Sequence, residues 1–570
     1  MDKRAIFAII LTFLIIILWG VIQSKFFPQT PSQPPSKEVK KEEGLPTKVE
    51  KLELKEEKIP AKRKMVTKKE VSIETPDYWA VFTTEDARLK HFKLKKFEDR
   101  VEESSLTVRL TRFIKELLGR KIEEQKKPMP LDLVNTNEGE GLPLGLTLLP
   151  FPSEGSWEVD KEKLHLLNRG EKGEIIFSKE FENGLKVAKK FGFTSDKNAI
   201  DLEVEIQNTS PKEVQVQLGL DWIGRIELEK LADEENKDYG LKFSFFKNQK
   251  LEKKTFGGAA SSGCTPGCGT QKRKVDSFEF SEKGDIGWYS FEGEYFAALL
   301  IPPSAERSLT MAVKGDEKNI LKVRGTLSPI SIPPKQAIKV PYRIYLGPKE
   351  IGRLRELGVG AEKLLDFGFF SIVAKPILWF LNLTNTVTKN YGIDIIIVSI
   401  LIKIIFIPLT QISMKSMKEM QKVQPEMTRL RETYKNDKAR LQQEIMLLYK
   451  RRKINPMSGC LPMLIQIPVF IALYNALQNA IEMRHAHFFW WIKDLSAKDP
   501  IYITPLIMGA TMVIQQKMTP TSADPTQAKM FMLMPIMFTF LFLSFPSGLV
   551  LYWLVNNVLS IAHQYYMNKK

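Results

Sequence analysis

The sequence predicts a multi-domain membrane protein: an α-helical bundle of six transmembrane spans, with a large all-β domain between the first span and the other five. Two observations predict this fold class. Residues 24–350 are rich in Lys and Glu, and long parts of them alternate apolar and polar residues as β-strands do. Residues 369–568 contain most of the long apolar runs, which are typical of membrane-spanning helices.

The composition argues against a sequence-specific nucleic-acid partner. The chain has 570 residues and a net charge of +17, which by itself is compatible with nucleic-acid binding. However, no zinc-finger or RNA-binding signature accompanies the charge. Basic residues beside apolar spans are more typical of the cytoplasmic side of a membrane.

The N-terminal segment, residues 1–23, predicts an uncleaved transmembrane anchor whose N-terminus is cytoplasmic. Lys3 and Arg4 precede an apolar stretch that is long for a signal peptide, and no small-residue cleavage site follows it. From Pro28 to Lys64, repeated prolines and dense charge occur without an aromatic residue. Such a composition does not bury enough surface to fold, so we expect residues 24–65 to form a flexible linker.

Residues 66–348 predict a large antiparallel β-sandwich. Leu202, Val204 and Ile206 alternate with charged residues, and a second alternating run begins at Val214 after an Asn-Thr-Ser-Pro turn. This pattern predicts a hairpin with one face in water. Residues 79–97 and 287–303 predict further strands.

The β domain shows no catalytic signature. It contains no G-x-S-x-G, no H-E-x-x-H and no phosphate loop, and only two histidines. We therefore expect a binding or spacer domain without catalytic residues, metal or cofactor. Cys264 and Cys268 lie in a glycine-rich segment, where they form either a local disulfide or two free thiols.

The region from 349 to 390 predicts an amphipathic helix at the membrane surface. Residues 369–388 carry aromatics on one side, and Lys375 and Asn382 supply polarity. A short spanning helix is the alternative. The region from 391 to 566 then predicts a core of five spans, at about 392–409, 460–481, 501–516, 530–545 and 549–563.

Loop charge orients these spans. Residues 411–458 carry twelve Lys and Arg against five Asp and Glu, a net charge of +7, which predicts a cytoplasmic loop. Alternating outward from it places the β domain outside the cytoplasm and both termini inside. Within the loop, apolar residues at helical spacing predict an αα-hairpin. Its methionines either bury one another or form an adaptable apolar surface: Met414, Met417, Met420 and Met427.

Lys403 lies inside the apolar run "DIIIVSILIKIIFIPLT". A lysine near the centre of a spanning helix costs about 2.5–3.5 kcal/mol on insertion scales. Its side chain tilts toward the helix N-terminus, away from the cytoplasmic face, which disfavours snorkelling. Ser399, Gln466 and Asn556 are further polar residues in spans. Together they predict a hydrated, positively charged pocket open to the cytoplasm, although polar contacts between helices are the simpler alternative.

Three long stretches resemble the YidC membrane protein insertases: residues 424–477, 491–512 and 545–560. The resemblance covers nearly all of the membrane half. The order of anchor, linker and β domain also fits the family type with a large periplasmic domain.

The resemblance implies a five-helix insertase core in the bacterial inner membrane and a periplasmic β-supersandwich related to sugar-binding folds. It implies a hydrophilic groove, open to the cytoplasm and to lipid, that receives nascent membrane proteins and releases them laterally. Lys403 matches the position of the groove's cation, which is typically arginine in the family. Ser399, Gln466, Tyr552 and Trp553 match groove positions, and the hairpin with Asp437 matches the loop that receives substrates.

The partners implied are the ribosome, the Sec translocon and lipid, and no chemical turnover is implied. Two other classes of function are compatible with parts of the sequence. A transporter or channel needs water access from both faces, but no internal repeat is evident. A membrane-anchored periplasmic carbohydrate-active enzyme would depend on the β domain instead of the spans.

Overall fold

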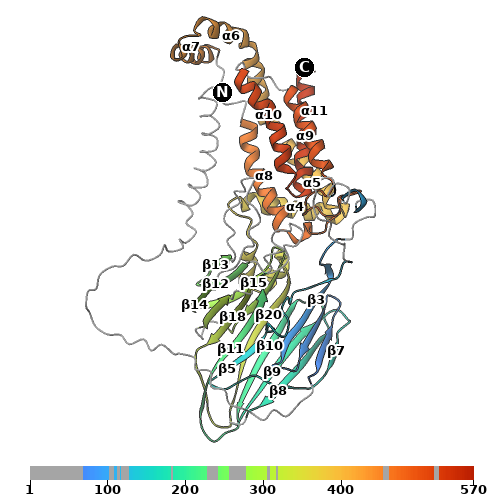
Figure 1. The fold of residues 1–570 in the computed structure, drawn as a ribbon, viewed down its shortest axis with the longest axis vertical. Coiled ribbons are helices and arrows are strands. Elements are labelled where there is room, and N and C mark those ends of the chain that lie inside the picture. The colour runs from blue at the N-terminus through green and yellow to red at the C-terminus, as the bar shows by residue number, and fades with distance from the viewer. Residues whose placement is uncertain are drawn as a thin grey trace, which may run out of the picture. The chain divides into compact units, whose positions relative to one another are not determined.

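The computed structural model describes residues 68–101, 108–111, 116, 127–181, 184–226, 242–255, 278–303, 309–315, 319–452, 461–518 and 525–569. A β-rich domain is followed by a helical region, which confirms the predicted fold class (Figure 1). The predicted anchor and linker, Cys264, Cys268 and Cys460 lie outside the described residues.

The described strands of the β domain form three sheets. Neighbouring strands are antiparallel except for β1 and β7, which are parallel. The first sheet has the order β4 (Pro130–Asp132), β3 (Arg88–Glu98), β2 (Tyr78–Thr83), β1 (Glu70–Glu74) and β7 (Lys163–His165). The second has the order β13 (Lys250–Thr255), β12 (Lys242–Lys247), β15 (Ile286–Glu292), β16 (Phe296–Ile301), β20 (Ala337–Pro348), β10 (Ala199–Asn208), β9 (Leu185–Thr194), β8 (Lys172–Glu180) and β6 (Glu158–Val159). The third has the order β14 (Phe278–Gly284), β17 (Leu309–Gly315), β18 (Ile320–Leu327), β11 (Val214–Arg225) and β19 (Ile330–Ile332), with β5 (Gly145–Leu149) also paired to β11.

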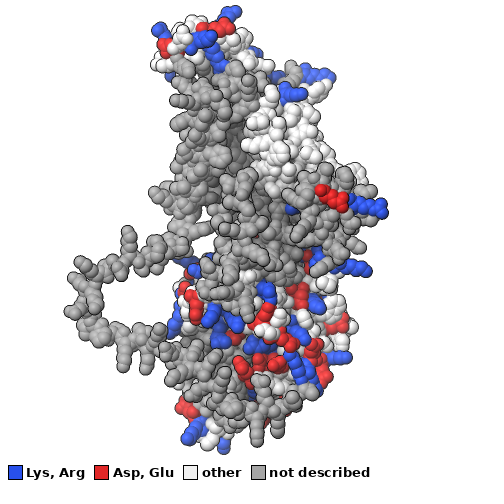
Figure 2. Space-filling view, viewed as in Figure 1, with Lys and Arg blue, Asp and Glu red and all other residues white. Residues whose placement is uncertain are grey.

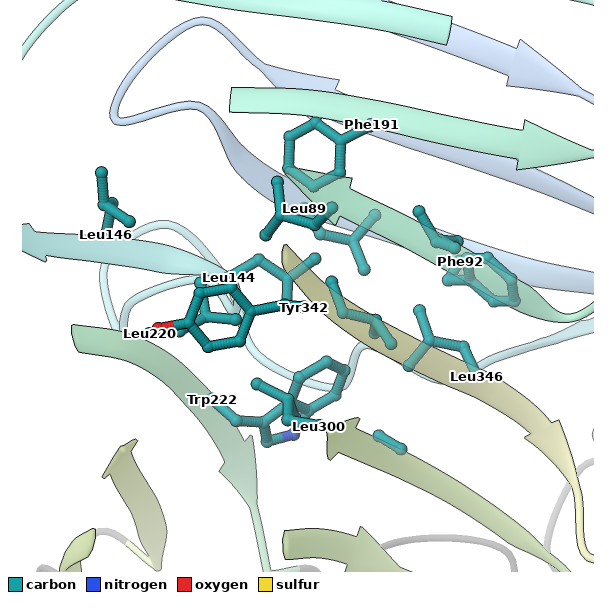
Figure 3. Close-up of a cluster of buried hydrophobic side chains, with 14 of the residues drawn as sticks. Leu89, Phe92, Leu144, Leu146, Phe191, Leu220, Trp222, Leu300, Tyr342 and Leu346 are labelled. Carbon is teal, nitrogen blue, oxygen red and sulfur yellow. The ribbon is translucent and has the colours of Figure 1, made fainter. Parts of the chain in front are cut away.

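The core of the β domain forms where the sheets face one another. Figure 3 shows side chains from all three sheets converging on one apolar cluster, among them Leu89 of β3, Phe191 of β9 and Trp222 of β11. Each is almost completely buried. Burial of apolar area is the main favourable contribution to folding, so this cluster joins the sheets into one domain.

The hairpin predicted for residues 200–222 is wrong, although both strands exist. β10 pairs with β9 and β20 in the second sheet, whereas β11 pairs with β5, β18 and β19 in the third. The alternation in β10 does give one wet face, but residues 218–224 of β11 are all buried. Alternating polarity predicts a strand and its buried face, but it does not choose the partner strand.

The strands predicted at residues 79–97 and 287–303 are confirmed. β2 pairs with β3, and β15 pairs with β16, in each case antiparallel and across a short connection. Short connections between neighbouring strands are the commonest way to form such pairs.

The helical region begins with short turns and continues with long helices. These are α3 (Ile351–Glu356), η1 (Ala361–Leu364), α4 (Ser371–Thr388), α5 (Tyr391–Lys422), α6 (Gln424–Thr433), α7 (Lys438–Arg451), α8 (Leu461–Asn479), η3 (Ile481–Met483), α9 (Ile503–Met518), α10 (Pro525–Phe542) and α11 (Ser547–Lys569). Helices therefore occupy most of each of the five predicted core spans. The predicted first span and the start of the cytoplasmic loop form one continuous helix, α5.

Among the described helices, α5 alone is long and apolar enough to cross a membrane. Met532–Phe542 within α10 is a shorter apolar stretch. The remaining spans stay predictions. In Figure 2 charged side chains gather over the β domain and the α6–α7 hairpin, while the described surface of the helical bundle is mostly uncharged. Large apolar side chains are exposed on α5 and α10, including Ile405, Met532 and Phe540.

Candidate functional site

The start of α5 is fixed by its N-cap. The side-chain oxygen of Asn390 accepts hydrogen bonds from the backbone amides of Gly392, at 2.9 Å, and Ile393, at 3.2 Å. Its side-chain amide donates to the carbonyl of Phe488 at 3.1 Å, which ties the helix start to the segment after α8. An N-cap of this kind satisfies amides that have no partner inside the helix, so the register of α5, and with it the place of Lys403, is set here.

Lys403 belongs to α5, and its side chain reaches toward α11. Its ammonium donates a hydrogen bond of 2.6 Å to the hydroxyl oxygen of Ser560. That hydroxyl in turn donates to the carbonyl of Asn556, one turn earlier on α11, at 2.7 Å. The Ser560 proton is therefore directed to its own helix, and a lone pair of its oxygen is directed to Lys403.

No carboxylate neutralises Lys403 within the described part of the chain. No ion pair involves its ammonium there, and the side chain is only partly exposed. An ammonium has three donors, and the hydrogen bond to Ser560 uses one of them. A half-buried cation without a counter-ion attracts anionic groups more strongly than a fully solvated one, because the surrounding dielectric constant is lower.

Tyr552, Asn556 and Ser560 follow one another at intervals of four on α11, so they share one face of that helix. Asn556 donates to the carbonyl of Tyr552 at 3.1 Å. Gln466 of α8 and Asn556 lie beside the buried Tyr552 hydroxyl, which makes no hydrogen bond among the described residues. We call Lys403, Ser560, Asn556, Tyr552 and Gln466 the Lys403 cluster.

Ser399 and Trp553 lie outside the Lys403 cluster. Ser399 is fully buried, and its hydroxyl donates to the carbonyl of Ile395 at 2.6 Å. The ring of Trp553 packs against Phe470 of α8, with centroids 5.2 Å apart and planes at 88°, and against Phe542 of α10, with centroids 5.2 Å apart. The structure therefore places Trp553 in an aromatic contact among three helices.

Other polar residues in the spans form contacts between segments. Asn557 donates to the Thr511 hydroxyl of α9 at 3.2 Å, and Gln564 donates to the carbonyl of Met518 at 2.7 Å. Asn475 of α8 donates to the carbonyl of Phe367 at 3.0 Å. Some of the polar residues in these helices therefore form hydrogen bonds between segments, which fits the alternative that they serve helix packing.

Sequence reasoning missed Ser560 and His563. His563 lies close enough to Lys403 for the lysine charge to act on its ring, and its buried Nδ1 has no hydrogen-bond partner among the described residues. The signal available in the sequence was spacing, because Ser560 and His563 follow Asn556 by four and seven residues.

The predicted hairpin is formed by α6 and α7. Val423, Met427 and Leu448 make a small buried cluster, against which Met420 packs. The Tyr449 hydroxyl also donates to the sulfur of Met427 at 3.3 Å. Met420 and Met427 thus bury part of their surface at the seam between the helices, which fits the first of the two readings of the methionines.

The remaining predicted hairpin residues differ in position. Asp437 is the N-cap of α7, and its carboxylate accepts from the backbone amide of Arg440 at 3.0 Å. Met414 is half-buried on α5, and the side chain of Met417 lies outside the described part. In the part of the chain that the structure describes, no group of three or more His, Cys, Asp or Glu residues is placed to hold a metal ion.

Comparison with known proteins covers both halves of the chain. The family model described as the YidC periplasmic domain matches residues 70–380, and the model described as the 60Kd inner membrane protein matches residues 382–570. A membrane protein insertase YidC of Syntrophus aciditrophicus is 41% identical over 88% of this chain and 85% of that protein. The one of Geobacter metallireducens is 36% identical over 100% of this chain and 98% of that protein. A solved structure titled as an active YidC insertase is 18% identical, covers 88% of this chain and 93% of that chain, and has a TM-score of 0.36.

Proposed function

The chain belongs to the YidC family of membrane protein insertases, and we propose that it uses the Lys403 cluster to bring nascent hydrophobic segments into the bacterial inner membrane. The observation that carries the role of the cluster is the half-buried ammonium of Lys403, whose hydrogen bond goes to the neutral Ser560. No carboxylate pairs with it in the described residues. A substrate carboxylate therefore has a cation available to it.

The proposed steps involve attraction of the substrate by charge and transfer of its apolar part from water into lipid, with no covalent chemistry. Lys403 attracts an acidic or polar part of the incoming chain, which lowers the cost of drawing that part toward the membrane interior. The apolar part then moves along the exposed apolar side chains of the bundle into lipid, driven by burial away from water. Exposed apolar residues suited to this contact lie on α10: Met532, Leu533, Ile536, Met537, Phe540 and Leu541.

The orientation proposed for the chain follows from its charges. The α6–α7 hairpin and both termini lie in the cytoplasm, and the β domain lies in the periplasm. The hairpin is rich in basic residues, so it offers a surface to the anionic ribosome. The Sec translocon is the other partner that the family relationship suggests. α4 lies at the membrane surface, because Ile372, Trp379 and Val387 expose apolar area on one side while Ala374 and Leu381 are buried on the other.

Substituting Lys403 tests the proposal. We expect Lys403→Ala to reduce insertion of a substrate with Asp or Glu in its translocated segment by about tenfold, the effect of about 1.4 kcal/mol. Lys403→Arg should retain most of the activity, because the charge is kept. Insertion is measured by protease protection in proteoliposomes, with a paired substrate in which Asn and Gln replace the acidic residues.

The matched control is Lys375→Ala, which removes an exposed lysine of α4. It should leave insertion of both substrates unchanged. Equal insertion of the acidic substrate by the wild-type protein and Lys403→Ala would disprove the proposed attraction by charge.

A further inference from the structure

Among the described residues, Ser560 is the side chain that accepts a hydrogen bond from the Lys403 ammonium. Its oxygen accepts the 2.6 Å hydrogen bond from Lys403, and its proton is used by the carbonyl of Asn556 at 2.7 Å. Because the second bond lies within α11, it directs a lone pair of the Ser560 oxygen toward α5. A serine in this state acts as a pure acceptor for the ammonium.

The lysine side chain needs such a partner. The side chain of lysine has a flexible stem of four carbons. In a bilayer, a long cationic side chain without a partner turns toward the nearest aqueous interface. Among the described residues, the side-chain amide of Asn556 donates to the carbonyl of Tyr552 and not toward Lys403, and the buried Nδ1 of His563 has no hydrogen-bond partner. The contact with Ser560 is therefore what fixes the ammonium against α11.

We propose that Ser560 is a positioning residue: it holds the Lys403 ammonium between α5 and α11, where an acidic segment of the substrate meets it. This inference rests on the proposed function of Lys403. Because the lysine side chain is already held in place, it loses less conformational entropy when a substrate binds. Ser560 thereby makes the cluster selective for acidic segments without touching the substrate.

The first experiment tests the geometry and does not depend on insertion. In Ser560→Asp, a zero-length carbodiimide reagent should join Lys403 to the new carboxylate as an amide, which is detected by mass spectrometry of the linked peptides. The same treatment of Ser544→Asp, an exposed position beyond the end of α10, should give no link to Lys403. Absence of the amide in well-folded Ser560→Asp would overturn the inference.

The second experiment tests the role. The ratio of acidic to neutral substrate inserted should fall about threefold in Ser560→Ala, the size expected for one lost hydrogen bond. Ser560→Thr keeps the hydroxyl, so its ratio of acidic to neutral substrate should equal that of the wild-type protein. A purely structural role for the site does not predict this recovery. In a Lys403→Ala background, Ser560→Ala should have no further effect, because it acts through the lysine.

The outcomes separate the two proposals. If Lys403→Ala lowers insertion of the acidic substrate and Ser560→Ala does not, the positioning role is wrong and the function of Lys403 stands. If the amide forms but Lys403→Ala inserts both substrates normally, the geometry is right and the attraction of acidic segments is wrong. A rise in the ratio in Ser560→Ala would show that Ser560 competes with the substrate, which also contradicts positioning.

Discussion

At the scale of single residues, Lys403 and Lys189 show two uses of a lysine that has no carboxylate partner among the described residues. Lys403 meets Ser560, and Lys189 of β9 donates to the carbonyls of Ala87 and Leu144, the latter at 2.8 Å. Lys189 is fully buried and lies over the ring of Phe191 at 5.5 Å. Lys189 thus links two loops of the β domain through their backbone carbonyls, whereas Lys403 supplies a cation in the helical bundle.

Lys189 predicts a pH dependence of stability. Burial, with a smaller effect of Arg88, lowers the pKa of Lys189 from 10.5 to about 7, against the opposing charges of Asp86 and Asp221. Between these two values the unfolded chain binds a proton that the folded chain does not bind, so folding stability rises with pH in this window. The β domain of the full-length protein should therefore unfold at a higher temperature at pH 9 than at pH 7.

This contribution is measured as the difference between the wild-type protein and Lys189→Met, with thermal unfolding followed by proteolysis of the β domain. The difference should change with pH, while Lys186→Met, at an exposed position of the same strand, should follow the wild-type protein. Identical pH dependence in Lys189→Met and the wild-type protein would refute the assignment.

At the scale of elements, a polar joint links the end of α4 to the start of α5. The buried carboxylate of Asp394, in the first turn of α5, accepts from the Asn385 side-chain amide at 2.8 Å and the Thr388 hydroxyl at 2.7 Å. A carboxylate at a helix N-terminus is also favoured by the helix dipole. The joint therefore couples the surface helix to the helix that carries Lys403.

Asp394→Ala should destabilise the protein by about 2 kcal/mol or more, because hydrogen bonds to a charged acceptor are lost and buried donors are left unpaired. The measurement is the midpoint of thermal unfolding in detergent. Thr386→Ala is the control, since this exposed hydroxyl bonds only to the carbonyl of Leu383 in its own helix, at 2.6 Å. A loss no larger than that of the control would contradict the coupling.

At the scale of the whole molecule, charge and apolar surface are divided between regions (Figure 2). Most of the charged side chains that Figure 2 shows lie over the β domain and the α6–α7 hairpin, and α5 and α10 expose large apolar side chains. Large exposed apolar surfaces of that kind are typical of contact with lipid or another apolar partner. This division is what a chain needs if it presents one end to the cytoplasm and another to the periplasm.

Cysteine labelling tests this orientation. In a background with Ser at positions 264, 268 and 460, Gln336→Cys marks the exposed turn between β19 and β20, and Asn436→Cys marks the exposed turn of the hairpin. A membrane-impermeant maleimide added to spheroplasts should label position 336 at once. It should reach position 436 only after the membrane is disrupted; labelling there in intact spheroplasts would reverse the proposed topology.

Local patterns in the chain predict the kind of each element. Alternating polarity predicted the strand of Leu202, because it reports which side of a strand is buried, and a long apolar run predicted the helix of Lys403. Tertiary structure alone decided which elements meet. It put β10 and β11 in different sheets and set Ser560 against Lys403, because pairing and packing depend on residues far apart in the chain, and the local pattern of one segment does not encode its partner.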